Sequence, residues 1–141
     1  MTSTDPAAAS RHRAGELYER DLTCQTLGIR LGDVAPGRAS VRMRVGEHMV
    51  NGHGTAHGGY LFLLADAAFS YACNTHGPVA VAQGAHVTFL QPVDVGDELV
   101  AEATERARRG LSGIYDVTVS RDGAAVAEFR GHSVLVTRRP A

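Results

Sequence analysis

Asp66 is the one formally charged residue between Glu47 and Asp94. It interrupts residues 58–73, a run of apolar and small side chains that is typical of a helix buried on every face. An ionised carboxylate in apolar surroundings is costly unless nearby groups compensate its charge. Asp66 is therefore a candidate for acid–base or nucleophilic chemistry, although an Asp inside a helix can also bond locally or face solvent.

A candidate partner for this acid lies just upstream, at the step into the predicted helix. The sequence there is His57-Gly58-Gly59, and Asn51 precedes it in a glycine-rich loop. The first amides of a helix have no intrahelical acceptor, and the helix dipole makes that end electropositive. Glycine lets a ligand approach closely, so the Gly58 or Gly59 N–H could hold a developing oxyanion. Asn51 could serve the ligand or merely hold the loop, and His57 is expected to shape the helix entry by hydrogen bonding.

The spacing of these groups bears on how many chains form the site. Gly58 and Asp66 are eight residues apart, which is about 12 Å along an α-helix. An aspartate side chain cannot span this distance. If both groups act on one carbonyl, they must come from two chains, and the site lies at a two-fold dimer interface in two equivalent copies.

Helical periodicity predicts which side chains surround Asp66. Residues three, four and seven positions away share its side of the helix, and these are Phe62, Leu63, Phe69, Ser70 and Cys73. They would form an apolar, partly aromatic pocket with one hydroxyl. Burial would raise the pKa of the carboxyl and hydrogen-bond donors would lower it. We expect a carboxylate that is ionised at neutral pH and works as a base or a nucleophile.

The histidines and cysteines do not predict a metal or redox centre. His53 and His57 have H-x-x-x-H spacing, but they lie on a glycine loop and lack the H-E-x-x-H pattern of a zinc helix. Cys24 and Cys73 are the only cysteines, and they are typical of small buried residues in a reducing cytosol. We therefore expect no metal, no cofactor and a cytoplasmic protein.

One domain must position these groups. The 141 residues, 44% of them hydrophobic, suit a single domain over 7–141 after a disordered tail at 1–6. The net charge of −1 provides no basic field for nucleic acid, and the first residues lack the pattern of a signal peptide. The apolar run around Leu61 is too short for a membrane span. Neither nucleic acid nor a membrane is an expected partner.

Alternation and turn signals predict the elements along the chain. They are a surface helix at 7–21, a short turn at 22–27, strands at 29–34 and 39–45, the buried helix from 58 to about 73, and strands at 79–90, 98–108, 114–121 and 125–136. A type I′ turn at Asp122-Gly123 should join the last two strands. One apolar helix among amphipathic strands requires a sheet that curls around it, so the predicted class is α+β.

Residues 51–74 resemble the core motif of the hot-dog-fold acyl-CoA thioesterases, and most closely that of the phenylacetic-acid-degradation thioesterase family. The motif is Asn-Gly at 51–52, His-Gly-Gly at 57–59 and Leu-Ala-Asp at 64–66, and the resemblance extends from about Gly15 to Val136. It implies a curved antiparallel sheet around one long central helix, in dimers that pair into homotetramers. It also implies that Asp66 is catalytic, that the Gly58 amide polarises the thioester carbonyl and that Asn51 positions the carbonyl or water.

Two further sets of residues are candidates for contact with such a substrate. The acyl part would meet His57, Gly59, Phe62, Phe69 and Ser70, of which Ser70 matches a water-positioning hydroxyl of more distant relatives. The coenzyme phosphates would meet the densest basic cluster, Arg106, Arg108 and Arg109. Solvated surface charge is the alternative interpretation of this cluster.

The leading function is hydrolysis of an acyl-CoA with an aryl or small acyl group, such as phenylacetyl or hydroxyphenylacetyl. A thioester is electrophilic enough for one base and one oxyanion donor, and Asp66 would activate water or form an anhydride. A serine hydrolase is disfavoured because no G-x-S-x-G elbow is present. One alternative is an enoyl-CoA hydratase or dehydratase, although His53 and His57 are not spaced from the acid as such motifs require. The other is a non-catalytic acyl-CoA-binding module.

Overall fold

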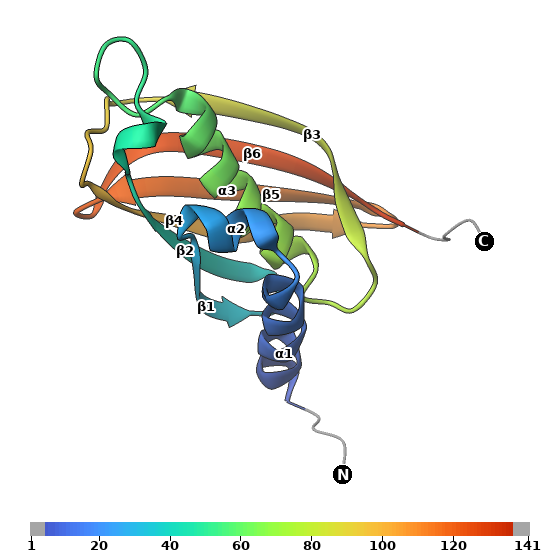
Figure 1. Ribbon diagram of the computed structural model, residues 1–141. Coiled ribbons are helices and arrows are strands. Elements are labelled where there is room, and N and C mark those ends of the chain that lie inside the picture. Colours follow the sequence, from blue (N-terminus) through green and yellow to red (C-terminus); the bar gives the residue numbers. More distant parts are fainter. Residues whose placement is uncertain (1–4, 137–141) are drawn as a thin grey trace.

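The computed structural model describes residues 5–136, and within them the order of elements follows the prediction (Figure 1). The helices are α1 (Pro6–Glu19), α2 (Leu22–Leu27) and α3 (Gly58–Cys73), with a 3₁₀ turn at Glu47–Met49. The strands are β1 (Arg30–Ala35), β2 (Arg38–Arg44), β3 (Ala80–Phe89), β4 (Glu98–Arg109), β5 (Ser112–Arg121) and β6 (Ala124–Leu135). The predicted type I′ turn is confirmed, because Asp122 and Gly123 both have positive φ, at 51° and 80°.

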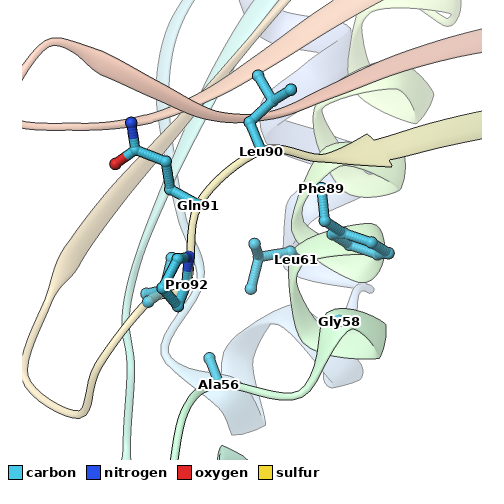
Figure 2. Close-up of a pocket in the computed structure, with 8 residues that line it drawn as sticks. Ala56, Gly58, Leu61, Phe89, Leu90, Gln91 and Pro92 are labelled. Atoms are coloured by element: carbon cyan, nitrogen blue, oxygen red, sulfur yellow. The ribbon is translucent and has the colours of Figure 1, made fainter.

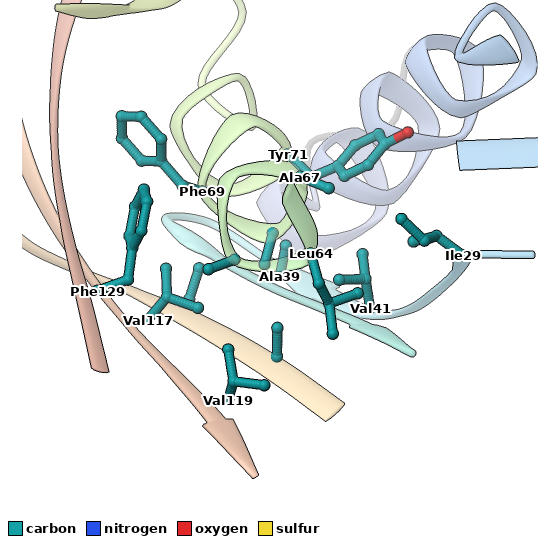
Figure 3. Close-up of a cluster of buried hydrophobic side chains, with 14 of the residues drawn as sticks. Ile29, Ala39, Val41, Leu64, Ala67, Phe69, Tyr71, Val117, Val119 and Phe129 are labelled. Atoms are coloured by element: carbon teal, nitrogen blue, oxygen red, sulfur yellow. The ribbon is translucent and has the colours of Figure 1, made fainter. Parts of the chain in front are cut away.

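The six strands form one antiparallel sheet that curves around α3, as predicted (Figure 1). Their order is β1-β2-β4-β5-β6-β3, and every neighbouring pair is antiparallel. Side chains of a strand alternate between the two faces of a sheet. On the inner face Val117 and Phe129 are register partners, and with Val41 they bury the inner side of α3 at Leu64 (Figure 3).

The helix α3 is not buried on every face, and this corrects the sequence interpretation. Leu64 and Ala68 are fully buried against the sheet, whereas Leu63, Asp66 and Ser70 are only half-buried. These three residues follow one another at helical spacing and form a partly open strip along α3. The strip exists because the sheet wraps only one side of the helix. Asp66 therefore lies at the boundary of the core and not inside it.

The strand β3 is an edge of the sheet, with a neighbour on one side only. Its residues are mostly exposed, and large apolar side chains are among them: Val81 is 45% exposed and Phe89 is 51% exposed. The opposite edge differs, since α1 packs against β1. A long edge with open backbone groups and exposed apolar side chains is a typical template for pairing with another strand.

The N-terminal boundary also differs from the prediction. The tail was expected to include Pro6, but Pro6 is the first residue of α1 and Asp5 is its N-cap, accepting a hydrogen bond from the Ala7 amide at 3.0 Å. Both residue types are favoured at those positions. The helix then ends at Glu19, because Asp21 begins α2 as its N-cap. Residues 1–4 and 137–141 lie outside the described residues.

Candidate active site

Backbone hydrogen bonds fix the point at which α3 begins. The Ala56 amide donates to the Val93 carbonyl at 2.7 Å, and the His57 amide donates to the Met49 carbonyl at 2.7 Å. His57 is the N-cap residue and has extended backbone angles, with φ −61° and ψ 134°. Its side chain makes no capping hydrogen bond, so the expectation that the imidazole shapes the helix entry is wrong: the backbone does this, and the His57 ring is exposed.

Asn51 holds the loop that leads to the helix. Its side-chain oxygen accepts hydrogen bonds from the amides of His53 at 2.9 Å and Thr55 at 3.3 Å, and its nitrogen donates to the Thr55 hydroxyl at 3.2 Å. This is an Asx-type turn, in which a short polar side chain substitutes for backbone partners. Asn51 therefore holds the loop, which is one of the two roles that the sequence allowed for it. A direct contact of Asn51 with the substrate stays a prediction.

The first residue of α3 lines a pocket. Gly58 and Gly59 are the first two residues of the helix, so their N–H groups have no intrahelical acceptor. Gly58 lines a pocket of about 420 Å³ together with Ala56, Leu61 and residues 89–93 (Figure 2). The lining is mainly apolar, and the dipole of α3 makes its helix end electropositive. This combination suits an uncharged group whose carbonyl oxygen becomes negative during reaction.

The surroundings of Asp66 make its carboxylate more basic than that of an ordinary aspartate. Its side chain is half-buried, and burial raises the pKa of the carboxyl above its ordinary value of 3.8. Within residues 5–136 of a single chain, no donor hydrogen-bonds this carboxylate. An acid whose charge is neither paired nor fully solvated is a stronger base than an ordinary aspartate. It remains available to a water molecule or to a substrate carbonyl.

The two cysteines are not candidates for the nucleophile. Burial first, and in addition the charge of Asp66, raises the pKa of the Cys73 thiol to about 12. Burial, the Asp21 carboxylate and more weakly Asp66 raise the pKa of Cys24 to about 12. The thiolate is the reactive form of cysteine, so both side chains are inert near neutral pH.

A single chain does not bring Asp66 and Gly58 together. Both residues lie in the continuous helix α3, and the eight residues between them correspond to about 12 Å of helix. Asp66 is absent from the lining of the pocket at Gly58. The continuous helix keeps Gly58 and Asp66 as far apart as their spacing in the sequence indicates. The two groups can therefore act on one carbonyl only if another chain supplies one of them.

The predicted aromatic pocket around Asp66 is only partly formed. Phe69 is 1% exposed and packs into the core, with its ring centroid 5.7 Å from that of Tyr115 and 5.8 Å from that of Phe129 (Figure 3). This burial contradicts a direct substrate contact, and Phe69 is a core residue. Phe62 is half-buried and also contacts Phe129, at 5.4 Å between centroids. Ser70 remains on the open strip beside Asp66.

The arginine cluster lies at the other end of the molecule from Gly58. Arg106 is 3.3 Å from an Asp116 oxygen, and Arg108 is 4.0 Å from Glu105. Glu105 in turn contacts His76 at 2.8 Å, just beyond the C-terminal end of α3. The 16 residues of α3 separate this end from Gly58 by about 24 Å within one chain. Arg109 is exposed beside them, and a phosphate contact of the cluster stays a prediction.

Sequence reasoning missed the residues that line the pocket at Gly58. Phe89, Leu90 and Pro92 are far from Gly58 in the chain, and helical or strand periodicity carries no information on this contact. The available signal was the Phe-Leu-Gln-Pro segment at 89–92, where a strand ends at a proline beside three non-charged residues. Within residues 5–136, no group of three His, Cys, Asp or Glu side chains is arranged to hold a metal ion.

Comparison with known proteins places this arrangement in a family. Residues 53–128 match the model of the thioesterase superfamily. The acyl-coenzyme A thioesterase PaaI of Escherichia coli is 44% identical over 121 residues, covering 85% of this chain and 86% of that protein. A putative esterase of Deinococcus radiodurans is 40% identical over 118 residues, covering 82% and 77%.

Solved structures agree with these relatives. The structure of the E. coli PaaI protein from the phenylacetic acid degradation operon superposes with a TM-score of 0.92 at 39% identity, covering 94% of this chain and 96% of that one. None of the helices between residues 5 and 136 combines the length and apolar character that a membrane crossing requires. The family match, the sequence identity and the structural superposition agree: the chain belongs to the thioesterase superfamily and is an enzyme of that family with the hot-dog fold.

Proposed function

We propose that this enzyme hydrolyses acyl-CoA thioesters of aryl or small acyl groups, such as phenylacetyl- or hydroxyphenylacetyl-CoA, to the free acid and CoA in the cytoplasm. The name of the E. coli relative, an acyl-coenzyme A thioesterase, supports the substrate class. The E. coli PaaI protein whose structure matches comes from the phenylacetic acid degradation operon, and this supports an arylacetyl group as the acyl part of the substrate. The single observation that carries the chemistry is the half-buried Asp66 carboxylate without a hydrogen-bond partner among residues 5–136.

The proposed site is shared by two chains. The Gly58 amide of one protomer holds the thioester oxygen, and Asp66 of the partner subunit faces the carbonyl carbon. Two features support such a pair: the apolar β3 edge has no neighbouring strand, and the strip of α3 that contains Asp66 is partly open. A two-fold axis would create two equivalent sites. Pairing of two dimers into a homotetramer is part of the same proposal.

The reaction needs no group beyond these. Asp66 takes a proton from water as the water oxygen attacks the carbonyl carbon, or its own oxygen attacks and the resulting anhydride is hydrolysed. In both cases the carbonyl oxygen becomes negative and is stabilised by the Gly58 N–H and the positive end of the α3 dipole. This tetrahedral adduct collapses with breakage of the C–S bond, which gives the acid directly in the water route and the anhydride in the other, and the CoA thiolate leaves and takes up a proton. Asn51 keeps the loop before α3 in place and is proposed to position the carbonyl or water.

Replacement of the acid tests this proposal. We expect Asp66→Ala and Asp66→Asn to lower kcat for thiol release from phenylacetyl-CoA by about 10²- to 10⁴-fold, because general-base or nucleophilic assistance is lost. The matched control is Asp33→Asn, which removes an exposed carboxylate on β1 and should leave the rate unchanged. A folded Asp66→Ala enzyme that hydrolyses aryl-CoA at the wild-type rate would rule out this role of Asp66.

A further inference from the structure

The ring of Phe89 lies directly against the start of α3. A β-carbon placed on Gly58 would be 2.8 Å from Cζ of Phe89 and 3.1–3.2 Å from two other ring atoms. These distances are shorter than ordinary van der Waals contact, so a larger residue at position 58 would force the ring to move from this position. Yet Phe89 is 51% exposed, so the rest of its surface is not used by the core. Figure 2 shows the ring at the end of β3 beside the first turn of α3.

The free surface of Phe89 belongs to the pocket at Gly58. The ring and the side chains of Leu61 and Pro92 line this space of about 420 Å³ (Figure 2). Pockets for small molecules begin at about 300 Å³, and an aromatic ring is held in a cavity of roughly 150 Å³. The space is therefore large enough for an aryl acyl group.

The pocket lining carries no formal charge. Gln91 contributes the most polar side chain of the lining, and the neighbouring cation is Arg121. The Arg121 guanidinium already contacts the Asp97 carboxylate at 2.9 Å and the Pro92 carbonyl at 3.1 Å. An acyl group with a free carboxylate would lose hydration of that carboxylate without gaining a free cation, and this is costly.

We propose that Phe89 is a specificity-determining residue: it forms the wall of an acyl pocket at Gly58 and selects an uncharged acyl group about as large as an arylacetyl group. This inference rests on the proposed function, in which the Gly58 amide receives the thioester carbonyl. Removing the ring removes apolar contact with an aryl group but leaves the amide and Asp66 in place. A small acyl group, which does not reach the ring, should be little affected.

The test compares phenylacetyl-CoA with acetyl-CoA and succinyl-CoA in thiol-release assays. In the wild type we expect kcat/KM to be lowest for succinyl-CoA. In Phe89→Ala we expect kcat/KM for phenylacetyl-CoA to fall about 10- to 100-fold, the effect of losing one large apolar contact, while the value for acetyl-CoA changes less than about threefold. An equal loss for both substrates, or an unchanged ratio, would overturn the proposal.

Control variants separate specificity from assembly, because Phe89 also lies on the exposed β3 edge. Leu111→Ala truncates an equally exposed side chain, 50% accessible, at the β4–β5 turn, and should leave the substrate ratio unchanged. Light scattering measures the mass of the assembly that each variant forms in solution. If Phe89→Ala assembles poorly, Phe89→Leu keeps an apolar side chain and should still shift the ratio against phenylacetyl-CoA by about threefold or more.

Calorimetry separates this proposal from the proposed function. If the wild type releases no thiol, hydrolysis is wrong, but binding of intact phenylacetyl-CoA still reports on the pocket. Phe89→Ala should then weaken the binding of phenylacetyl-CoA about tenfold more than that of acetyl-CoA. Equal weakening of both would show that Phe89 does not select the acyl group.

Discussion

At the scale of single residues, Asp66 conflicts with its own helix. Every local signal of α3 favours burial, and an acid at this position is unfavourable for the folded chain, since burial raises its pKa. Sequences that specify one structure avoid such conflicts except where function requires them. The absence of a hydrogen-bond donor to this carboxylate within residues 5–136 points in the same direction, because a structural acid at such a site would be paired.

Asp66→Asn should therefore stabilise the protein while it removes activity. The pKa of Asp66 is raised on folding, so ionisation favours the unfolded chain as pH rises above 3.8 and through the folded value. At neutral pH the variant lacks this penalty, and its midpoint of thermal unfolding should lie a few degrees above that of the wild type, at roughly 4 °C per 1 kcal/mol. Well below pH 3.8 the acid is neutral in both states, and the difference should vanish. A lower midpoint for Asp66→Asn at pH 7 would contradict this account.

At the scale of elements, a polar cluster at Asp21 links the start of α2 to α3. The Asp21 carboxylate accepts a hydrogen bond from the Cys24 amide at 3.0 Å as the N-cap of α2, and another from the Tyr71 hydroxyl at 2.8 Å. Tyr71 lies in α3 and is 1% exposed (Figure 3). Burial raises the pKa of Asp21, but the donors at Cys24 and Tyr71 outweigh it, and the pKa lies below 3.8. The Asp21 carboxylate thus links the start of α2 directly to α3.

Asp21→Ala should destabilise the fold by about 2–3 kcal/mol, of which a helix N-cap contributes about 1 and the unsatisfied Tyr71 hydroxyl the rest. Because the pKa of Asp21 is lowered on folding, its contribution is complete above pH 3.8 and is lost as pH falls through the folded value. Urea unfolding at pH 7 and at pH 3 measures both effects. In a double-mutant cycle, Tyr71→Phe should cost less than Asp21→Ala and show coupling with it. A cost that does not depend on pH would assign the loss to packing alone.

The elements show what the sequence could and could not predict. Strand and helix positions follow from local alternation, glycine and proline, so the β5–β6 hairpin and the start of α3 at Gly58 were predictable. The orientation of α3 was not, because a helix with apolar residues on all sides carries no signal for which side meets the sheet. Phe69, which was expected to line a pocket beside Asp66, packs into the core. The contact of Phe89 with Gly58 depends on the path of β3 along β6, which only tertiary packing decides.

At the scale of the whole molecule, the proposed function divides the site between two chains, and each chain contains both parts in separate places. The pocket at Gly58 contains the proposed oxyanion donor but no acid, and the open strip of α3 contains the proposed acid, Asp66. The apolar β3 edge provides the surface through which a second copy can bring the halves together. If so, activity is a property of chain pairs, and each site takes its two groups from different chains.

Complementation between two inactive variants tests this directly. Asp66→Asn lacks the acid, and Gly58→Val lacks the open oxyanion position, since its β-carbon would meet the Phe89 ring at 2.8 Å. In assemblies that form at random from equal amounts of both chains, a site is intact only when Gly58 comes from the first variant and Asp66 from the second. Co-expression of the two should thus restore about a quarter of the wild-type thiol-release activity, whether dimers or tetramers form.

The control is a chain that carries both substitutions. Co-expressed with Asp66→Asn, it supplies no intact acid to any site, so activity should stay at the level of the single variants. If each site were formed within one chain, the first mixture would show no restored activity, because no chain in that mixture contains both Gly58 and Asp66. Restoration in the first mixture and not in the second would therefore assign the acid and the amide to different protomers, while no restoration in either would contradict the shared site.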